Sequence, residues 1–104
     1  MAENLTPSKF NQKIKAGITA IEFWAPWCAP CRKMKTVFER VESKFSEIKF
    51  GRINVDECRE LASKWAIVSI PTLIVFSKGK EAERFVGVAP KEVIENELRT
   101  RLAK

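Results

Sequence analysis

The stretch from residue 18 to residue 25 is apolar at every position except Thr19 and Glu22. A strand that is apolar on both of its alternating faces must be covered on both sides, which is typical of a central strand in an α/β protein. Residues 28–47 follow, and this segment carries apolar side chains at intervals of three and four: Met34, Val37, Phe38, Val41 and Phe45. That spacing predicts a helix with one buried stripe. Residues 50–56 are predicted to form a second strand, so we expect a strand–helix–strand unit with parallel strands and a right-handed crossover.

The remaining segments alternate between helix and strand patterns: a helix over residues 6–17, a helix around 58–65, a strand over 72–77, a strand roughly over 81–86 and a final helix from Pro90. The first helix is expected to begin at Thr6-Pro7 and to stop at Gly17. Lys78-Gly79 is expected to turn the chain back into an antiparallel strand. The inner face of the final helix is predicted to carry Val93, Ile94, Leu98 and Leu102.

The sequence predicts an α/β fold with a central mixed sheet and helices on both faces. The sheet is expected to have four to five strands, because any strand before Thr6 would be very short. The 104 residues form one domain, 1–104, which is long enough to bury roughly two-thirds of its unfolded surface. We find no apolar run of membrane-spanning length and no signal peptide. We therefore expect a cytoplasmic protein that does not associate with membranes, in a compartment where thiols stay reduced.

The net charge of +6 raises the question of nucleic-acid binding. The basic residues are spread along the chain and are mostly interleaved with glutamates, as on solvated helix faces. We therefore expect no nucleic-acid partner. One basic cluster, Arg32, Lys33 and Lys35, directly follows a pair of cysteines; it would favour a thiolate there and steer acidic partners, or it would serve solubility alone.

The cysteine pair, Cys28 and Cys31, stands between the central strand and the helix that follows it. Unpaired N–H groups and the positive end of the helix dipole lower the pKa of a thiol at a helix amino terminus, so Cys28 is the candidate nucleophile. Cys31 lies one turn further on and is placed to release a bound partner by forming the Cys28–Cys31 disulfide. The pattern therefore predicts thiol–disulfide exchange.

A Cys-x-x-Cys pair is also half of many zinc sites. The chain has no histidine and only one further cysteine, Cys58, so a fourth ligand of an uncommon kind would be needed, and we expect no metal. The lack of histidine also excludes a cysteine protease that relies on an imidazole. The position of Cys58 at a helix start should lower the pKa of its thiol, whereas the neighbouring acidic residues should raise it. We expect an inert thiol at the surface or half-buried, with a regulatory or dimer-forming role as the alternative.

Several segments resemble thioredoxins in order and spacing: Glu22-Phe23-Trp24-Ala25, Trp27-Cys28-Ala29-Pro30-Cys31, Asn54-Val55-Asp56, Ile70-Pro71-Thr72, Lys78-Gly79 and Val86-Gly87. The likeness covers nearly the whole chain. It implies the thioredoxin fold and a protein-disulfide reductase that cycles Cys28 and Cys31 between dithiol and disulfide. It also implies that no cofactor is bound, that electrons come from thioredoxin reductase or an equivalent enzyme, that the targets are disulfide-containing proteins, and that the protein is a monomer.

The resemblance also assigns roles to residues around the pair. Pro71 is expected to follow a cis peptide bond and to face the cysteines, which would leave the backbone of Ile70 free to pair with an extended substrate. Pro30 is expected to stiffen the pair, and Trp27 to offer an exposed apolar contact face, while Trp24 is expected in the core. The other substrate-binding candidates are Ala29, Val68, Ser69, Gly87 and Val88.

Glu22 is the only charged residue between Ile18 and Arg32, on a strand that we expect to be buried. A buried carboxylate is costly unless it is protonated or paired, so its pKa should be raised. Glu22 could then exchange a proton with Cys31 near neutral pH. Thioredoxins carry aspartate at the similar position. The alternative is a purely structural ion pair with Arg52, where the family often has lysine.

The chain departs from typical thioredoxins in two further places. It has Ala-Pro between the cysteines where they have Gly-Pro, and it has Thr36 where many have a kink-forming proline, so we expect a straighter helix after the pair. Two other functions stay open from the residues. One is a disulfide oxidant or isomerase, which the reduction potential would reveal. The other is a non-catalytic binding module that uses the surface of Trp27 and Pro71.

Overall fold

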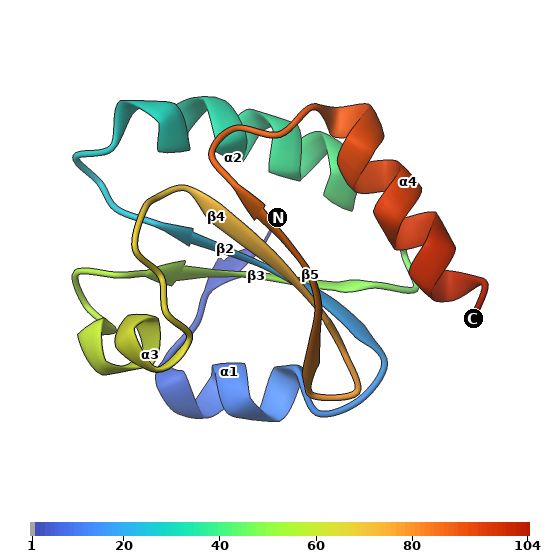
Figure 1. Ribbon diagram of the computed structural model, residues 1–104, viewed down its shortest axis with the longest axis horizontal. Helices are drawn as coiled ribbons and strands as arrows, with labels where there is room; N and C mark the ends of the chain where they lie inside the picture. The colour runs from blue at the N-terminus through green and yellow to red at the C-terminus, as the bar shows by residue number, and fades with distance from the viewer. Residues whose placement is uncertain (1) are drawn as a thin grey trace.

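The computed structural model describes residues 2–104, in which five strands and four helices alternate except that β5 follows β4 directly (Figure 1). In chain order they are β1 (Glu3–Asn4), α1 (Pro7–Lys13), β2 (Ile18–Trp24), α2 (Ala29–Glu42), β3 (Lys49–Asn54), α3 (Arg59–Lys64), β4 (Thr72–Ser77), β5 (Lys80–Val86) and α4 (Lys91–Leu102). The predicted succession of elements is confirmed, and the strand before Thr6 is indeed only two residues long.

The five strands form one sheet in the order β1-β3-β2-β4-β5. β3 runs parallel to both β1 and β2, whereas β4 is antiparallel to β2, and β5 is antiparallel to β4. The sheet is therefore mixed, and β2 lies at its centre, as the apolar pattern of this segment predicted. The register places Glu22 of β2 opposite Arg52 of β3, so two charged residues meet in the middle of the sheet.

Helices cover both faces of the sheet (Figure 1): α2 and α4 lie on one face, and α1 and α3 on the other. Met34 and Phe38 of α2 pack with Ile94 of α4 over Ala20 of β2. On the opposite face, Phe10 of α1 packs against apolar side chains of the strands, including Ile21, Phe23, Ile74 and Phe76. Because side chains alternate along a strand, Glu22 points to the same face as Ala20, which is the face that α2 covers.

Three details of the helices differ from the predictions. α1 ends at Lys13, before the chain reaches Gly17, where it was expected to stop. α2 ends at Glu42 rather than near residue 47, because the chain continues through tight turns with bonds from the Phe45 N–H to the Glu42 carbonyl and from the Ile48 N–H to the Phe45 carbonyl. Phe45 is buried although it lies beyond the end of α2, so the apolar spacing continues past the helix. The helix is continuous through Thr36.

The buried stripe of α4 was predicted only in part. Ile94 and Leu98 are buried, but Val93 and Leu102 are 46% and 38% exposed. One residue along a helix turns the side chain by about 100°, so the stripe through Ile94 and Leu98 takes in Glu95 and leaves Val93 outside. Glu95 is stabilised there by surrounding cations: Lys44 at 3.3 Å, Lys91 at 3.5 Å and Arg99 at 3.4 Å.

The amino-terminal end of α2 and the carboxyl-terminal end of α4 lie at opposite ends of the molecule (Figure 1), whose longest extent is 34 Å. No helix within residues 2–104 is both long enough and apolar enough to cross a membrane.

Candidate active site

The cysteine pair lies where β2 gives way to α2. Two backbone hydrogen bonds hold the loop between β2 and α2. The Val55 N–H, just after β3, donates to the Trp24 carbonyl at the end of β2, and the Cys28 N–H donates to the Ala25 carbonyl. Cys28 is the N-cap residue of α2, and its Sγ accepts a hydrogen bond from the Cys31 N–H over 3.2 Å. The first turn of the helix thus directs a backbone donor at this sulfur, which is the arrangement that stabilises a thiolate.

Cys28 and Cys31 are joined by a disulfide, with their Cα atoms 5.3 Å apart, so the structure holds the oxidised form of the pair. Pro30 lies in the first turn of α2, where a helix has no use for the missing N–H. Both cysteines are buried, Cys28 at 5% exposed and Cys31 at 2%. Of the two cysteines, Cys28 therefore has the slightly larger exposed fraction.

The segment before β4 closes one side of the pair. The Ile70–Pro71 peptide bond is cis, as expected, and Ile70 packs against the buried cluster of Ala25, Cys28 and Cys31. The Ile70 carbonyl oxygen lies 3.8 Å from the Cys28 Sγ. The Gly87 N–H donates to the Pro71 carbonyl over 2.8 Å, which places the end of β5 beside this segment.

A shallow groove of about 350 Å³ runs beside the disulfide and is lined by Trp27, Val55, Ile67, Val68, Ser69 and Ile70. Trp27 is 68% exposed and Val68 is 93% exposed, so large apolar side chains stand free at the rim. Val88 is also exposed, as are Ala29 and Ser69. The structure thus brings most of the candidate substrate-binding residues to one surface, with Gly87 tied to it through Pro71.

Asp56 is a member of this site that the sequence analysis did not single out. Its Oδ2 accepts a hydrogen bond from the Trp27 Nε1 over 2.9 Å, and its N–H donates to the Asn54 Oδ1 over 2.9 Å. The bond fixes the exposed indole ring against the end of β3. The available signal was the position of Asp56 just after a strand that ends at the same edge of the sheet as Cys28.

Glu22 is fully buried on β2, and the Arg52 Nε donates to its Oε1 over 2.9 Å. Its second oxygen, Oε2, is buried and accepts no hydrogen bond from any group of residues 2–104. Burial raises the pKa of Glu22 above its ordinary value of 4.5, and the opposing effect of the Arg52 charge and hydrogen bond is too small to reverse this shift. The predicted burial, the raised pKa and the pairing with Arg52 are all present.

Arg52 is itself held from the other side. Its guanidinium carbon lies 4.2 Å from the centre of the Trp24 ring, and the Trp24 Nε1 donates to the Asn4 Oδ1 over 2.8 Å. Trp24 was expected in the core, but it is half-buried. Its indole N–H reaches the edge strand β1 and bonds to an exposed residue there. Asn4, Trp24, Arg52 and Glu22 form one continuous chain of contacts from β1 to the centre of the sheet.

A second, smaller cleft opens on the α2 side of the disulfide. Its volume is about 160 Å³, and it is lined by Trp24, Ala25, Pro26, Cys31, Arg32, Lys35 and Arg52. We call it the cationic cleft, because three of these side chains are positively charged. Cys31 and the arginine that binds Glu22 thus lie in the wall of the same cleft.

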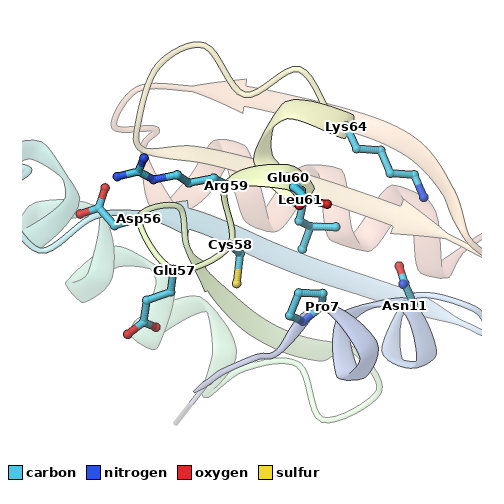
Figure 2. Close-up of a pocket in the computed structure, with 9 residues that line it drawn as sticks. All are labelled: Pro7, Asn11, Asp56, Glu57, Cys58, Arg59, Glu60, Leu61 and Lys64. Carbon is cyan, nitrogen blue, oxygen red and sulfur yellow. The ribbon is translucent and has the colours of Figure 1, made fainter.

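Cys58 lies away from the pair, in the wall of a pocket of about 690 Å³ between α1 and α3 (Figure 2). It is buried rather than half-buried or at the surface, because its side chain packs in the apolar cluster that includes Leu5 and Leu61, and its Sγ lies 3.9 Å from the Leu5 carbonyl oxygen. Burial, together with the charge of Glu57, raises the pKa of this thiol. Within residues 2–104, no group of three or more His, Cys, Asp or Glu side chains could hold a metal ion.

A dithiol pair at the start of the helix that follows the central strand of such a sheet defines a thiol–disulfide oxidoreductase. The sequence pattern of the family described as thioredoxin matches residues 1–100. The thioredoxin of Chlamydia caviae is 37% identical over 88% of this chain and 90% of its own length, and that of Bacillus subtilis is 37% identical over 86% and 88%. The thioredoxin of Alicyclobacillus acidocaldarius is 40% identical over 90% of this chain and 91% of its own.

Solved structures agree on the fold. A mutant thioredoxin from Halobacterium salinarum superposes with a TM-score of 0.87 over 96% of this chain and 88% of its own, at 23% identity. A thioredoxin from Malassezia sympodialis gives 0.84 over 97% and 90%, at 26% identity. The chain belongs to the thioredoxin family, and it is a thiol–disulfide oxidoreductase that uses the Cys28–Cys31 pair. Membership implies, in general terms, a reductase and disulfide-containing proteins as partners.

Proposed function

We propose that this protein reduces disulfides in other proteins, with Cys28 as the attacking thiolate and Cys31 as the resolving thiol. The observation that carries the assignment is the hydrogen bond from the Cys31 N–H to the Cys28 Sγ at the N-cap of α2. The donor and the helix field act on the Cys28 sulfur and stabilise negative charge there, which favours Cys28 as the attacking group. Cys31, which is more deeply buried, acts only after Cys28 has bound a target.

The exchange runs in two steps. The Cys28 thiolate attacks one sulfur of a target disulfide, forms a mixed disulfide with it, and releases the other target sulfur as a thiolate. The Cys31 thiol then loses its proton and attacks the Cys28 Sγ, which forms the Cys28–Cys31 disulfide and releases the second target thiolate. The target gains two electrons and the protein loses two. The oxidised product of this cycle is the form that the structure holds.

Glu22 is the proposed acceptor of the Cys31 proton. Its Oε2 is unpaired, and its raised pKa lets it change protonation state closer to neutral pH. Glu22 itself does not line the cationic cleft, but its partner Arg52 does, together with Cys31. We propose that the proton passes between the Cys31 thiol and the Glu22 carboxylate on the α2 side of the sheet, to which Glu22 points.

The proposed target-binding surface is the groove beside the disulfide. An extended target segment would pair with the backbone of Ile70, next to Pro71, and lie against Trp27, Ala29, Val68, Ser69, Gly87 and Val88. Backbone pairing provides affinity that does not depend on the target's sequence. The exposed Trp27 ring, which Asp56 holds in place, contributes apolar contact area.

Membership of the family supports the remaining proposals. Electrons come from thioredoxin reductase or an equivalent enzyme, so the protein needs no bound cofactor beyond its own cysteine pair. We propose that it acts as a cytoplasmic monomer and does not bind nucleic acid.

Trapping tests the assignment of the two cysteines. The Cys31→Ser variant should accumulate a mixed disulfide with an oxidised target protein, visible as a shifted band on a non-reducing gel, whereas Cys28→Ser should not. The matched control, Cys58→Ser, should keep full activity. A mixed disulfide formed through Cys31 in the Cys28→Ser variant would overturn the assignment.

The direction of transfer is tested by the reduction potential of the pair in thiol–disulfide buffers. A value near about −270 mV is expected for a reductant. A value between about −180 and −120 mV would instead identify an oxidant or isomerase.

A further inference from the structure

The outer part of the cationic cleft carries positive charge without a carboxylate to balance it. Arg32 and Lys35 are exposed residues of the first two turns of α2, and both line the cleft beside Cys31. Within residues 2–104, neither forms an ion pair with a carboxylate; the Arg32 guanidinium makes one long hydrogen bond, of 3.5 Å, to the Pro26 carbonyl oxygen. Lys33 adds a third exposed cation on the same turn.

Within residues 2–104, no nearby carboxylate forms an ion pair with Arg32 or Lys35. Glu22 is buried and bonded to Arg52, and Asp56 is bonded to Trp27. Glu39 follows Lys35 by one helical turn, yet no ion pair joins them. Arg52 is nine-tenths buried in the floor of the cleft, so its guanidinium is partly desolvated and held rigid by the Trp24 ring. The disulfide therefore has an apolar groove on one side and a cationic cleft on the other.

We propose that the cationic cleft makes the protein prefer target disulfides that carry an acidic side chain next to the cysteine under attack. This inference rests on the proposed function and names its substrate class. A carboxylate entering the cleft would accept hydrogen bonds from Arg32 and lie close to Lys35, in a partly desolvated place where charge-assisted bonds are strong. The same charges would speed the encounter with acidic targets and repel basic ones.

The test uses three cyclic disulfide peptides that differ only in the residues on both sides of one cysteine, which are glutamate, glutamine or lysine. Protein reduced beforehand is mixed with each peptide in a single turnover, and oxidation of the protein is followed by tryptophan fluorescence. The second-order rate constants should fall in the order glutamate, glutamine, lysine, with about a fivefold difference between the extremes at low salt. The difference should shrink towards one at about 0.5 M salt.

The double variant Arg32→Gln/Lys35→Gln should bring the ratio of the glutamate and lysine rate constants to within about twofold. The ratio is used because any effect of the lost charges on the Cys28 thiolate applies equally to every peptide. The matched control, Lys15→Gln/Arg40→Gln, removes the same net charge from exposed positions that do not line the cleft. It should keep the wild-type ratio.

Equal rate constants for the three peptides with the wild-type protein would overturn this inference and leave the proposed function intact. An equal loss of preference in the control variant would also overturn it, since overall charge rather than the cleft would then be responsible. If the reduced protein reacts with none of the peptides while dithiothreitol reduces all three, the proposed function itself fails.

Discussion

The Nε of Arg52 lies 2.9 Å from the Oε1 of Glu22, across two strands whose register places the residues directly side by side. One oxygen of the carboxyl group is therefore paired, and the other is buried without a partner in the described part of the chain. A fully ionised Glu22 would need bonds to both oxygens to offset its loss of hydration. Because only one is present, burial prevails and the pKa of Glu22 is raised.

The Glu22→Gln variant should change how stability depends on pH. The folded wild-type protein holds a proton on Glu22 above the ordinary pKa of 4.5, so its free energy of unfolding falls as the pH rises from that value through the raised pKa, and then levels off. Glutamine does not titrate, so the stability of the variant relative to the wild type should increase with pH over this window. Urea unfolding of both oxidised proteins at steps from about pH 4 to about pH 9 measures the difference. Parallel curves would contradict the raised pKa.

Asn4→Ala should act on Glu22 from a distance. It removes the acceptor of the Trp24 Nε1 bond, so the ring that lies against Arg52 is held less firmly, and Arg52 lowers the pKa of Glu22 less. We expect a further rise in this pKa, together with a loss of about 1 kcal/mol in the free energy of unfolding. Carbon-13 NMR of the Glu22 carboxyl group measures the pKa. Asn11→Ala, on the exposed side of α1, is the control and should leave it unchanged.

Gly51→Ala should disturb the join between β1 and the centre of the sheet. A Cβ atom on Gly51 would lie 2.5 Å from the Leu5 Cδ1 and 3.2 Å from the Ile21 Cδ1, in a packed region. We expect a loss of about 1–3 kcal/mol in the free energy of unfolding, from overpacking. Leu5→Ala removes the clashing atom, so the double variant should lose less than the sum of the single losses. Strict additivity would mean that Leu5 moves aside at no cost.

Cys58 should react slowly with alkylating reagents in the folded protein. It is 8% exposed, and its raised pKa leaves little thiolate near neutral pH. In the oxidised protein it is the one free cysteine, so iodoacetamide labelling followed by mass spectrometry reports on it alone. The native rate should be at least about tenfold below the rate in urea. Similar rates would show that the pocket around Cys58 opens readily.

The parts of the site that could be predicted from the sequence are those that depend on neighbouring residues. The position of Cys28 at the start of a helix follows from local periodicity, and the burial of Glu22 follows from its place in an apolar strand. The bonds from Trp27 to Asp56 and from Trp24 to Asn4 could not be predicted in this way. The first bond joins residues 29 positions apart, and the second joins residues 20 positions apart. Both depend on side-chain orientations that only the packed structure determines.

The same limit explains two further burials that were predicted wrongly. The depth of Cys58 depends on how α3 meets the chain at Leu5, which is 53 positions away. On α4 the apolar pattern favoured Val93, but Glu95 is the buried residue. Its charge is stabilised by Lys44, Lys91 and Arg99, one of which comes from another part of the chain.

The wide separation between the start of α2 and the end of α4 has a practical consequence for attaching this protein to a support. A linker joined at Lys104 would project from the end of the molecule that lies opposite the disulfide (Figure 1). Molecules anchored in this way on a bead or an electrode would present their cysteines outward to dissolved proteins. Anchoring through the lysines of α2 would instead turn the reactive end of the molecule towards the support.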